Sequence, residues 1–186
     1  MARLAYTFIA SLDGYIEDPD GRFDWGEPSE EAHAFINELT AEAGTYLYGR
    51  RMYETMAVWE TDPAFAEESA AMRDFVTIWQ AADKVVYSST LAEAATQRTR
   101  IERSFDPDAV RELKAAAESD LAIGGAEIAA QALKAGLVDE CHVFLAPVVI
   151  GGGKPALPDD VRLDLELTDQ RRFEGGMAYL RYAIRR

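Results

Sequence analysis

The feature that most constrains the fold is an alternation of short β-prone runs with segments of helical periodicity. The β-prone runs lie at 4–10, 45–48, 84–87, 100–104, 121–123 and 140–149, and helical spacing of apolar residues falls at 28–39, 65–82, 106–114 and 126–135. Two last β-prone runs, at 163–173 and 177–184, flank Glu174-Gly175-Gly176 and predict a hairpin. This order predicts an α/β fold with a mixed, mainly parallel central sheet, flanking helices and a C-terminal antiparallel hairpin.

Composition limits the function classes that are open to this chain. A length of 186 residues supports one well-packed core, so we expect a single domain over residues 1–186. The 19 basic and 33 acidic residues give a net charge of −14, which disfavours nucleic acid and anionic membranes. One cysteine and two histidines argue against a multi-cysteine or histidine-rich metal site. We find no signal peptide and no apolar run of about 18 residues, and therefore expect a cytoplasmic protein.

Small, glycine or cationic residues follow several predicted strands. In an open α/β sheet, ligands bind beyond the carboxyl ends of the strands. The groups found there are Gly49, Arg50 and Arg51, then Ser88 and Ser89, then Gly124, Gly125, Ala126 and Glu127. A glycine turn before a helix lets backbone N–H groups approach a pyrophosphate, and arginine is a forked partner for a terminal phosphate. A dinucleotide with a 2′-phosphate would satisfy these features.

Each of these motifs also has a plain structural interpretation. A Gly-Gly pair between strand and helix is often only a tight turn, paired arginines are often solvated surface, and serines at a strand end are often caps. The chain lacks the GxGxxG fingerprint, and the glycines at 151–153 lack the lysine-serine ending of a phosphate-binding P-loop.

Two carboxylates are candidates for work at the substrate. Asp13 follows a β-prone run, where it either stabilises a turn or faces a pocket. Glu31 lies in the first turn of a predicted helix, one turn before the apolar Phe35, where it either stabilises the helix dipole or borders a pocket. Trp25 lies in an acidic loop, and a loop tryptophan needs a docking place. We assign Asp13 and Glu31 as candidate catalytic residues, and Asp13, Trp25, Glu31 and Phe35 as candidate substrate-binding residues.

Six segments together resemble a known family. They are S-L-D-G-Y at 11–15, L-Y-G-R-R-M-Y-E at 47–54, K-V-V-Y-S-S-T-L at 84–91, I-G-G-A-E at 123–127, A-G-L-V-D-E at 135–140 and P-V-V-I-G-G-G-K-P at 147–155. The chain resembles the dihydrofolate reductase fold superfamily. It is more closely similar to the reductase domain of bifunctional riboflavin-biosynthesis deaminase-reductases and to the stand-alone forms of that domain. The signature of the deaminase half is absent from the sequence.

The resemblance implies a sheet of about eight strands with NADPH across its carboxyl edge. By position it implies that the adenosine-side phosphates are met by Gly49, Arg50 and Arg51, and that the 2′-phosphate or adenine end is held by Ser88 and Ser89. It also implies that the pyrophosphate passes over a helix N-terminus formed by Gly124, Gly125, Ala126 and Glu127. Ala10 would flank the nicotinamide. Asp13 would lie at the mouth of the substrate pocket and Glu31 would bind the substrate ring. Met52 stands where that superfamily usually has threonine.

Our functional prediction is an NADPH-dependent reductase that transfers hydride to a small heterocyclic substrate, either a pyrimidine like a riboflavin precursor or a pterin-like ring. The acidic stretch 13–42 contains one basic residue, Arg22, which favours a neutral or cationic ring over a phosphorylated one. The alternatives are a genuine dihydrofolate reductase and a non-catalytic, dimeric dinucleotide-binding protein. A homodimer is expected by analogy with the family.

Overall fold

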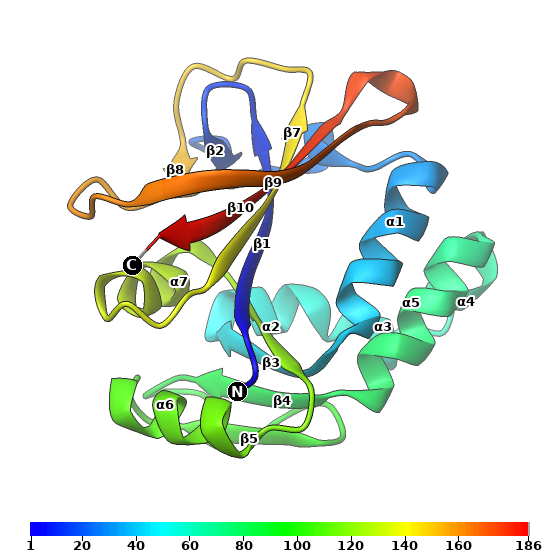
Figure 1. The fold of residues 1–186 in the computed structure, drawn as a ribbon. Helices are drawn as coiled ribbons and strands as arrows, with labels where there is room; N and C mark the ends of the chain where they lie inside the picture. The colour runs from blue at the N-terminus through cyan, green and yellow to red at the C-terminus, as the bar shows by residue number, and fades with distance from the viewer. Residues whose placement is uncertain (186) are drawn as a thin grey trace.

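The computed structural model describes residues 1–185 of the chain. Its main strands are β1 Leu4–Ser11, β3 Ala43–Gly49, β4 Asp83–Tyr87, β5 Thr99–Glu102, β6 Asp120–Gly124, β7 Glu140–Ala146, β9 Asp164–Arg172 and β10 Ala178–Arg185. Within the described residues, these eight strands form one sheet in the order β5-β4-β3-β6-β1-β7-β10-β9 (Figure 1). The first six strands in this order, from β5 to β7, pair in parallel with their neighbours. Strand β10 is antiparallel to both of its neighbours, β7 and β9. This confirms the predicted mixed, mainly parallel sheet and its C-terminal hairpin.

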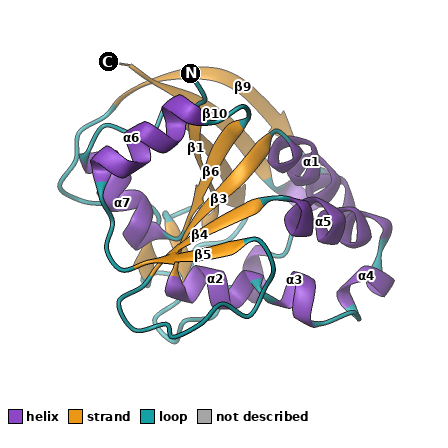
Figure 2. Ribbon diagram, turned by 90° about the horizontal axis from the view of Figure 1, so that it is seen from below, coloured by secondary structure: helices purple, strands orange, loops and turns teal. Residues whose placement is uncertain are grey.

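Helices cover both faces of the sheet. They are α1 Glu30–Ala41, α2 Arg50–Met56, α3 Val58–Thr61, α4 Phe65–Glu68, α5 Ala70–Ala81, α6 Pro107–Ala116 and α7 Ala126–Lys134, with short 3-10 turns η1 Asp24–Gly26 and η2 Glu174–Gly176. Helices α6 and α7 lie on one side of the sheet, and α1 and α5 lie on the other (Figure 2). Turn η2 connects the two strands of the C-terminal hairpin, as predicted.

Two predicted boundaries are wrong. The single helix expected over 65–82 is divided, because Ser69 takes an extended conformation and its hydroxyl accepts a hydrogen bond from the N–H of Met72, which caps α5. The strand expected over 140–149 ends at Ala146, directly before Pro147. Proline has no N–H to donate to a ladder, and this favours a strand end at that point.

The core is built from the two faces of the sheet. On the α6–α7 side, buried residues of β1, β6 and β7 pack against Ile128 and Leu133 of α7. On the opposite side, Trp79 of α5 is fully buried and its indole N–H donates to the Tyr48 hydroxyl at 3.2 Å. The α6–α7 face of the central strands is therefore apolar, whereas the face toward α1 also holds the polar side chains of Glu140 and His142.

A second, two-stranded sheet was not expected from the sequence. Strand β2, Tyr15–Glu17, pairs antiparallel with β8, Lys154–Pro155, and Glu17 stands opposite Lys154. Each strand is too short to show a period of two. We call this pair the β2–β8 ribbon. Among residues 1–185, none of the helices combines the length and apolar character that a membrane span requires.

Candidate functional site

The turns named in the sequence analysis meet at one edge of the sheet. Strands β3 and β6 are neighbours, with Tyr48 opposite Gly124, and strands β1 and β7 are neighbours, with Ser11 opposite Ala146. All four strands run parallel, so the segments that follow them share the carboxyl edge. Ala10, the expected nicotinamide neighbour, is buried on β1 one residue before this edge.

The glycine bend after β6 is shaped by tight packing. A Cβ atom at Gly124 would lie 2.9 Å from Cε1 of Tyr48, and one at Gly125 would lie 3.1 Å from Cβ of Met52. Gly125 also has a φ of +96°, which favours glycine. The two glycines thus let the bend lie against β3 and α2. Helix α7 begins directly afterwards at the buried Ala126, and N–H groups of a first helical turn have no intrahelical acceptor.

Arg50 and Arg51 open α2 just after Gly49 and diverge from each other. Arg50 donates from Nε to Glu54 at 2.7 Å and from Nη1 to the Thr90 hydroxyl at 2.9 Å, in the turn after β4. Arg51 donates from Nη1 to Glu17 of the β2–β8 ribbon at 3.2 Å. Both side chains are largely exposed, at 47% and 67%. One guanidinium therefore faces the β4 side of the edge and the other faces the ribbon.

The two serines after β4 differ in environment. Ser88 is buried, and its hydroxyl accepts hydrogen bonds from the N–H groups of Thr90 at 3.3 Å and Leu91 at 3.0 Å. Ser89 is exposed. Ser88 thus shapes the turn that presents Thr90 to Arg50, while Ser89 is open to solvent.

Asp13 ties two loops of the edge together. Its carboxylate accepts hydrogen bonds from the N–H groups of Ile150 at 3.2 Å and Gly151 at 2.8 Å. Hydrogen bonds from the Ser11 side chain and from these two N–H groups lower the pKa of Asp13 below its ordinary value. The side chain is exposed and is ionised at neutral pH.

Glu31 lies in the first turn of α1, and Trp25 lies in the 3-10 turn η1. Glu31 is exposed, and its Oε2 accepts a hydrogen bond from the N–H of Glu174 at 3.0 Å, in the hairpin turn η2. The half-buried Trp25 donates its indole N–H to the carbonyl of Arg22 at 3.2 Å. It packs against the aromatic cluster below α1, which is formed by Phe35, Phe144, Phe173 and Tyr179. Each candidate carboxylate, Asp13 or Glu31, thus anchors a loop from the C-terminal part of the chain.

Phe35 lies inside that aromatic cluster. It is 6% exposed, and its ring lies 4.8 Å from the ring of Tyr179 and 5.4 Å from that of Phe173. The guanidinium of Arg171 lies 4.1 Å from the Phe35 ring centroid. Phe35 is therefore a core residue beneath the edge.

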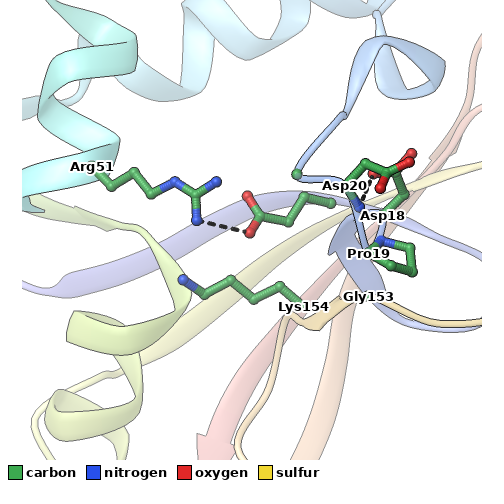
Figure 3. A pocket seen from close by; sticks show the side chains of 8 residues that line it. Asp18, Pro19, Asp20, Arg51, Gly153 and Lys154 are labelled. Carbon is green, nitrogen blue, oxygen red and sulfur yellow. Dashed lines mark hydrogen bonds and ion pairs between the residues drawn. The ribbon is translucent and has the colours of Figure 1, made fainter.

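Sequence reasoning missed two charged residues of the edge. Lys154 forms an ion pair with Glu127 at 2.5 Å, and Glu17 accepts from Arg51. Contact with Lys154, aided by the charge of Arg51, lowers the pKa of Glu127. Glu17, Arg51 and Lys154 line an open hollow of about 440 Å³ beside the β2–β8 ribbon, and the loop of Asp18 and Asp20 lines its other side (Figure 3). The position of Lys154 directly after three glycines was a usable signal, whereas Glu17 carried none.

Comparisons with known proteins point to one family. The model of the RibD C-terminal domain matches residues 2–179. The chain is 28% identical over 184 residues to the uncharacterized protein YyaP of Bacillus subtilis (strain 168), with 97% of this chain and 94% of that relative covered.

Solved structures show the same fold. One from Shewanella sp. PV-4, named for riboflavin biosynthesis, has a TM-score of 0.77 at 21% identity over the whole of both chains. The diaminohydroxyphosphoribosylaminopyrimidine deaminase/5-amino-6-(5-phosphoribosylamino)uracil reductase of Thermotoga maritima has a TM-score of 0.65 at 15% identity, covering 98% of this chain and 56% of that one. Because the family model spans residues 2–179, the chain belongs to the RibD C-terminal domain family, and this membership supports a reductase role.

Proposed function

We propose that the chain is an NADPH-dependent reductase that transfers hydride to a small heterocyclic substrate, either a riboflavin-precursor-like pyrimidine or a pterin-like ring. The observation that carries the proposal is the adjacency of Gly124 and Tyr48, which brings the glycine bend beside the arginines that begin two residues after Tyr48. A bend before a nine-residue helix, next to guanidinium groups, suits a pyrophosphate with a further phosphate. The nicotinamide, when bound, supplies the hydride.

The residues present fit such a cofactor. Arg50 and Arg51 are exposed cations on one helix, and each is held by a single acidic side chain that a phosphate can replace. Tyr48 and Met52 fill the space beside Gly124 and Gly125, so we assign pyrophosphate binding to the N–H groups at the start of α7. We keep Gly49, Ser88, Ser89, Ala126 and Glu127 as further cofactor contacts and Ala10 as the nicotinamide neighbour.

On the substrate side, we propose distinct roles for the candidate residues. The carboxylate of Asp13, with a pKa below its ordinary value, is ionised at neutral pH and is a hydrogen-bond acceptor suited to a ring N–H. Glu31 and Trp25 would line the rim, and Phe35 would support it from the core. Arg22, the single basic residue of 13–42, is already paired with Asp20 at 2.9 Å. This local charge supports a neutral or cationic ring as the substrate.

A titration tests the cofactor proposal. Tryptophan fluorescence should be quenched by NADPH, and Arg50→Ala should weaken NADPH binding roughly tenfold or more if it removes one charged hydrogen-bonding partner of the 2′-phosphate. The loss for NADH should be smaller. Arg162→Ala, which removes an exposed guanidinium before β9, is the matched control and should change neither.

Turnover separates the rival functions. Oxidation of NADPH in the presence of a pyrimidine or pterin from a substrate panel is the expected result. Binding of NADPH by the folded protein without turnover of any panel member would favour the non-catalytic alternative. Absence of NADPH binding by folded wild-type protein would refute the proposed function.

We further propose that the chain pairs with a second copy through β9, the edge strand. Leu165 and Leu167 are 40% and 47% exposed and stand opposite Ile184 and Tyr182 on β10. Strand β9 begins with Asp164 and Glu166 and ends with Arg171 and Arg172, so two antiparallel copies related by a two-fold axis bring opposite charges together.

Size-exclusion chromatography with light scattering on the eluted protein measures its mass and tests the dimer. We expect a dimer for the wild type and a monomer for Leu167→Glu, with Leu157→Glu, at an exposed leucine outside β9, as the control. A wild-type monomer at micromolar concentration would contradict the pairing.

A further inference from the structure

The β2–β8 ribbon is built to lie tightly over the carboxyl edge. A Cβ atom at Gly153 would lie 1.9 Å from the carbonyl oxygen of Glu17, so the two strands meet at a distance that glycine alone permits. The Tyr6 hydroxyl of β1 donates to the carbonyl of Ala156, directly after β8, at 2.8 Å and ties the ribbon to the main sheet. The Ala156 N–H donates to the carbonyl of Gly14, which extends the pairing of the ribbon into the turn before β2. These contacts hold its backbone in place without any charged group.

Two ion pairs connect this ribbon to the turns of the candidate cofactor site. Glu17 of β2 contacts Arg51 of α2 at 3.2 Å, and Lys154 of β8 contacts Glu127 of α7 at 2.5 Å. The ribbon therefore contributes the anion of one pair and the cation of the other. In Figure 3, the ends of the Arg51 and Lys154 side chains lie on the same side of the hollow, away from the loop of Asp18 and Asp20.

Solvent reaches one partner of each pair, which limits what the pairs contribute to stability. The Arg51 and Glu127 side chains are 67% and 83% exposed, whereas Glu17 and Lys154 are half-buried at 17% and 24%. Pairs that are open to solvent on one side contribute about 1 kcal/mol. A phosphate group accepts the same donors as a carboxylate and carries more charge. Asp18 and Asp20 do not compete for the two cations, because they bind the Arg22 N–H and the Arg22 guanidinium of their own loop.

We propose that Glu17 and Glu127 hold Arg51 and Lys154 in place of a phosphate, and that both cations change partners when a dinucleotide phosphate enters the hollow. Lys154 is then a third phosphate-binding cation beside Arg50 and Arg51, and Glu17 is an intramolecular competitor of the ligand. This inference rests on the proposed function, since that function supplies the dinucleotide. The exchange itself is a property of the charges and extends to inorganic pyrophosphate.

The two substitutions should shift affinity in opposite directions. Glu17→Gln removes the competitor and should tighten the binding of pyrophosphate and of NADPH by up to about fivefold, because an ion pair of up to about 1 kcal/mol no longer has to be broken. Lys154→Gln should weaken both by about tenfold or more, because a charged hydrogen bond is lost. The control is Lys134→Gln, which removes the exposed pair with Asp160 at the other end of α7 and should leave binding unchanged.

Calorimetry with pyrophosphate and with NADPH, on variants shown to be folded by circular dichroism, decides the matter. Weakened binding in both Glu17→Gln and Lys154→Gln would mean that the pairs only maintain the ribbon, and would overturn the exchange. Unchanged binding in both, with NADPH bound by the wild type, would overturn it and leave the proposed function standing. If the two variants shift the affinity for pyrophosphate in opposite directions but the wild type does not bind NADPH, the exchange is supported and the proposed function is refuted. A wild type that binds neither ligand would refute both.

Discussion

Oδ2 of Asp13 accepts a hydrogen bond from the backbone N–H of Gly151 at 2.8 Å, across 138 residues of sequence. A second bond from Ile150 reaches the other carboxylate oxygen. The loop that follows β7 contains three consecutive glycines with positive φ, and such a segment has high conformational freedom on its own. Asp13 therefore fixes the start of this loop against the turn after β1, and the proposed substrate position depends on that attachment.

We expect Asp13→Ala to release the loop without unfolding the protein, because the side chain is exposed and is not part of the core. Hydrogen exchange at the Ile150 and Gly151 amides should become faster in Asp13→Ala and intermediate in Asp13→Asn, which keeps one acceptor oxygen. The pKa of Asp13 is lowered, so the attachment is present above the ordinary value of 3.8 and is lost as the pH falls through the lower folded value. Exchange rates equal to those of the wild type in both variants would contradict this role.

A pair of glycine substitutions isolates the β2–β8 contact. Gly153 and Gly151 both have positive φ, at +138° and +76°, so alanine strains the backbone at either position. Only at Gly153 does the added Cβ collide with the carbonyl of Glu17. Gly153→Ala should therefore expose the Glu17 and Lys154 amides to exchange, while Gly151→Ala should leave them protected. Equal protection in the two variants would show that the close approach is not needed.

The buried charge cluster under α1 predicts a pH-dependent stability. Burial raises the pKa of Glu140, but hydrogen bonds from His142 and Arg181 and the charges of Arg181 and Arg3 outweigh it and bring the pKa to about 2. Because this folded value is below the ordinary 4.5, the stabilisation is fully present above pH 4.5 and is lost as the pH falls toward 2.

At pH 7, Glu140→Gln should lower the free energy of unfolding by about 1–2 kcal/mol, a figure reduced for partial screening by solvent. The difference from the wild type should shrink steadily below pH 4.5. Glu102→Gln, which removes an exposed pair with Arg100, serves as the control and should change stability by less than about 0.5 kcal/mol. Urea titrations at several pH values measure both. A Glu140→Gln effect that is independent of pH would argue against the ionised cluster.

The aromatic cluster predicts a large cavity effect. Phe144 is fully buried, with the rings of Phe35, Phe173 and Tyr179 within 6.3 Å of its own. Phe144→Ala should lower the free energy of unfolding by about 3–5 kcal/mol. Phe23→Ala, at a side chain that is 54% exposed, should cost less than about 1 kcal/mol in the same denaturation experiment. Similar losses in the two variants would mean that the cluster is loosely packed.

The periodic pattern was sufficient to predict the sheet class and the hairpin. Buried parallel strands such as β4 appear in the sequence as short apolar runs. Glycine, proline or serine stands where these runs end and a turn begins. The same logic predicted that Gly124 and Arg50 follow strands, and the parallel pairing of β3 and β6 then brought their turns together. Local pattern and global fold agree in these segments.

The sequence could not predict which side chains contact each other across the candidate site. Nothing local indicates that Arg50 contacts Thr90 while Arg51 contacts Glu17, because the two arginines are neighbours and their partners lie on different loops. Asp13 and Glu31 likewise anchor loops that lie more than 130 residues away along the chain. Ser69 ends one helical segment and caps the next within an apolar pattern that stays periodic across it. Such details are set by tertiary contacts.

The central position of β1 also bears on how the protein is made. This strand precedes the other strands of the sheet in the chain, yet both of its neighbours, β6 and β7, lie beyond residue 119. Asp13 and Glu31 likewise bind backbone groups at 151 and 174. A nascent chain on the ribosome therefore carries an apolar segment with no strand to pair with until β6 and β7 have been synthesised. Fragments that stop before β7 should leave one side of β1 unpaired and should therefore aggregate more readily than the chain that includes it.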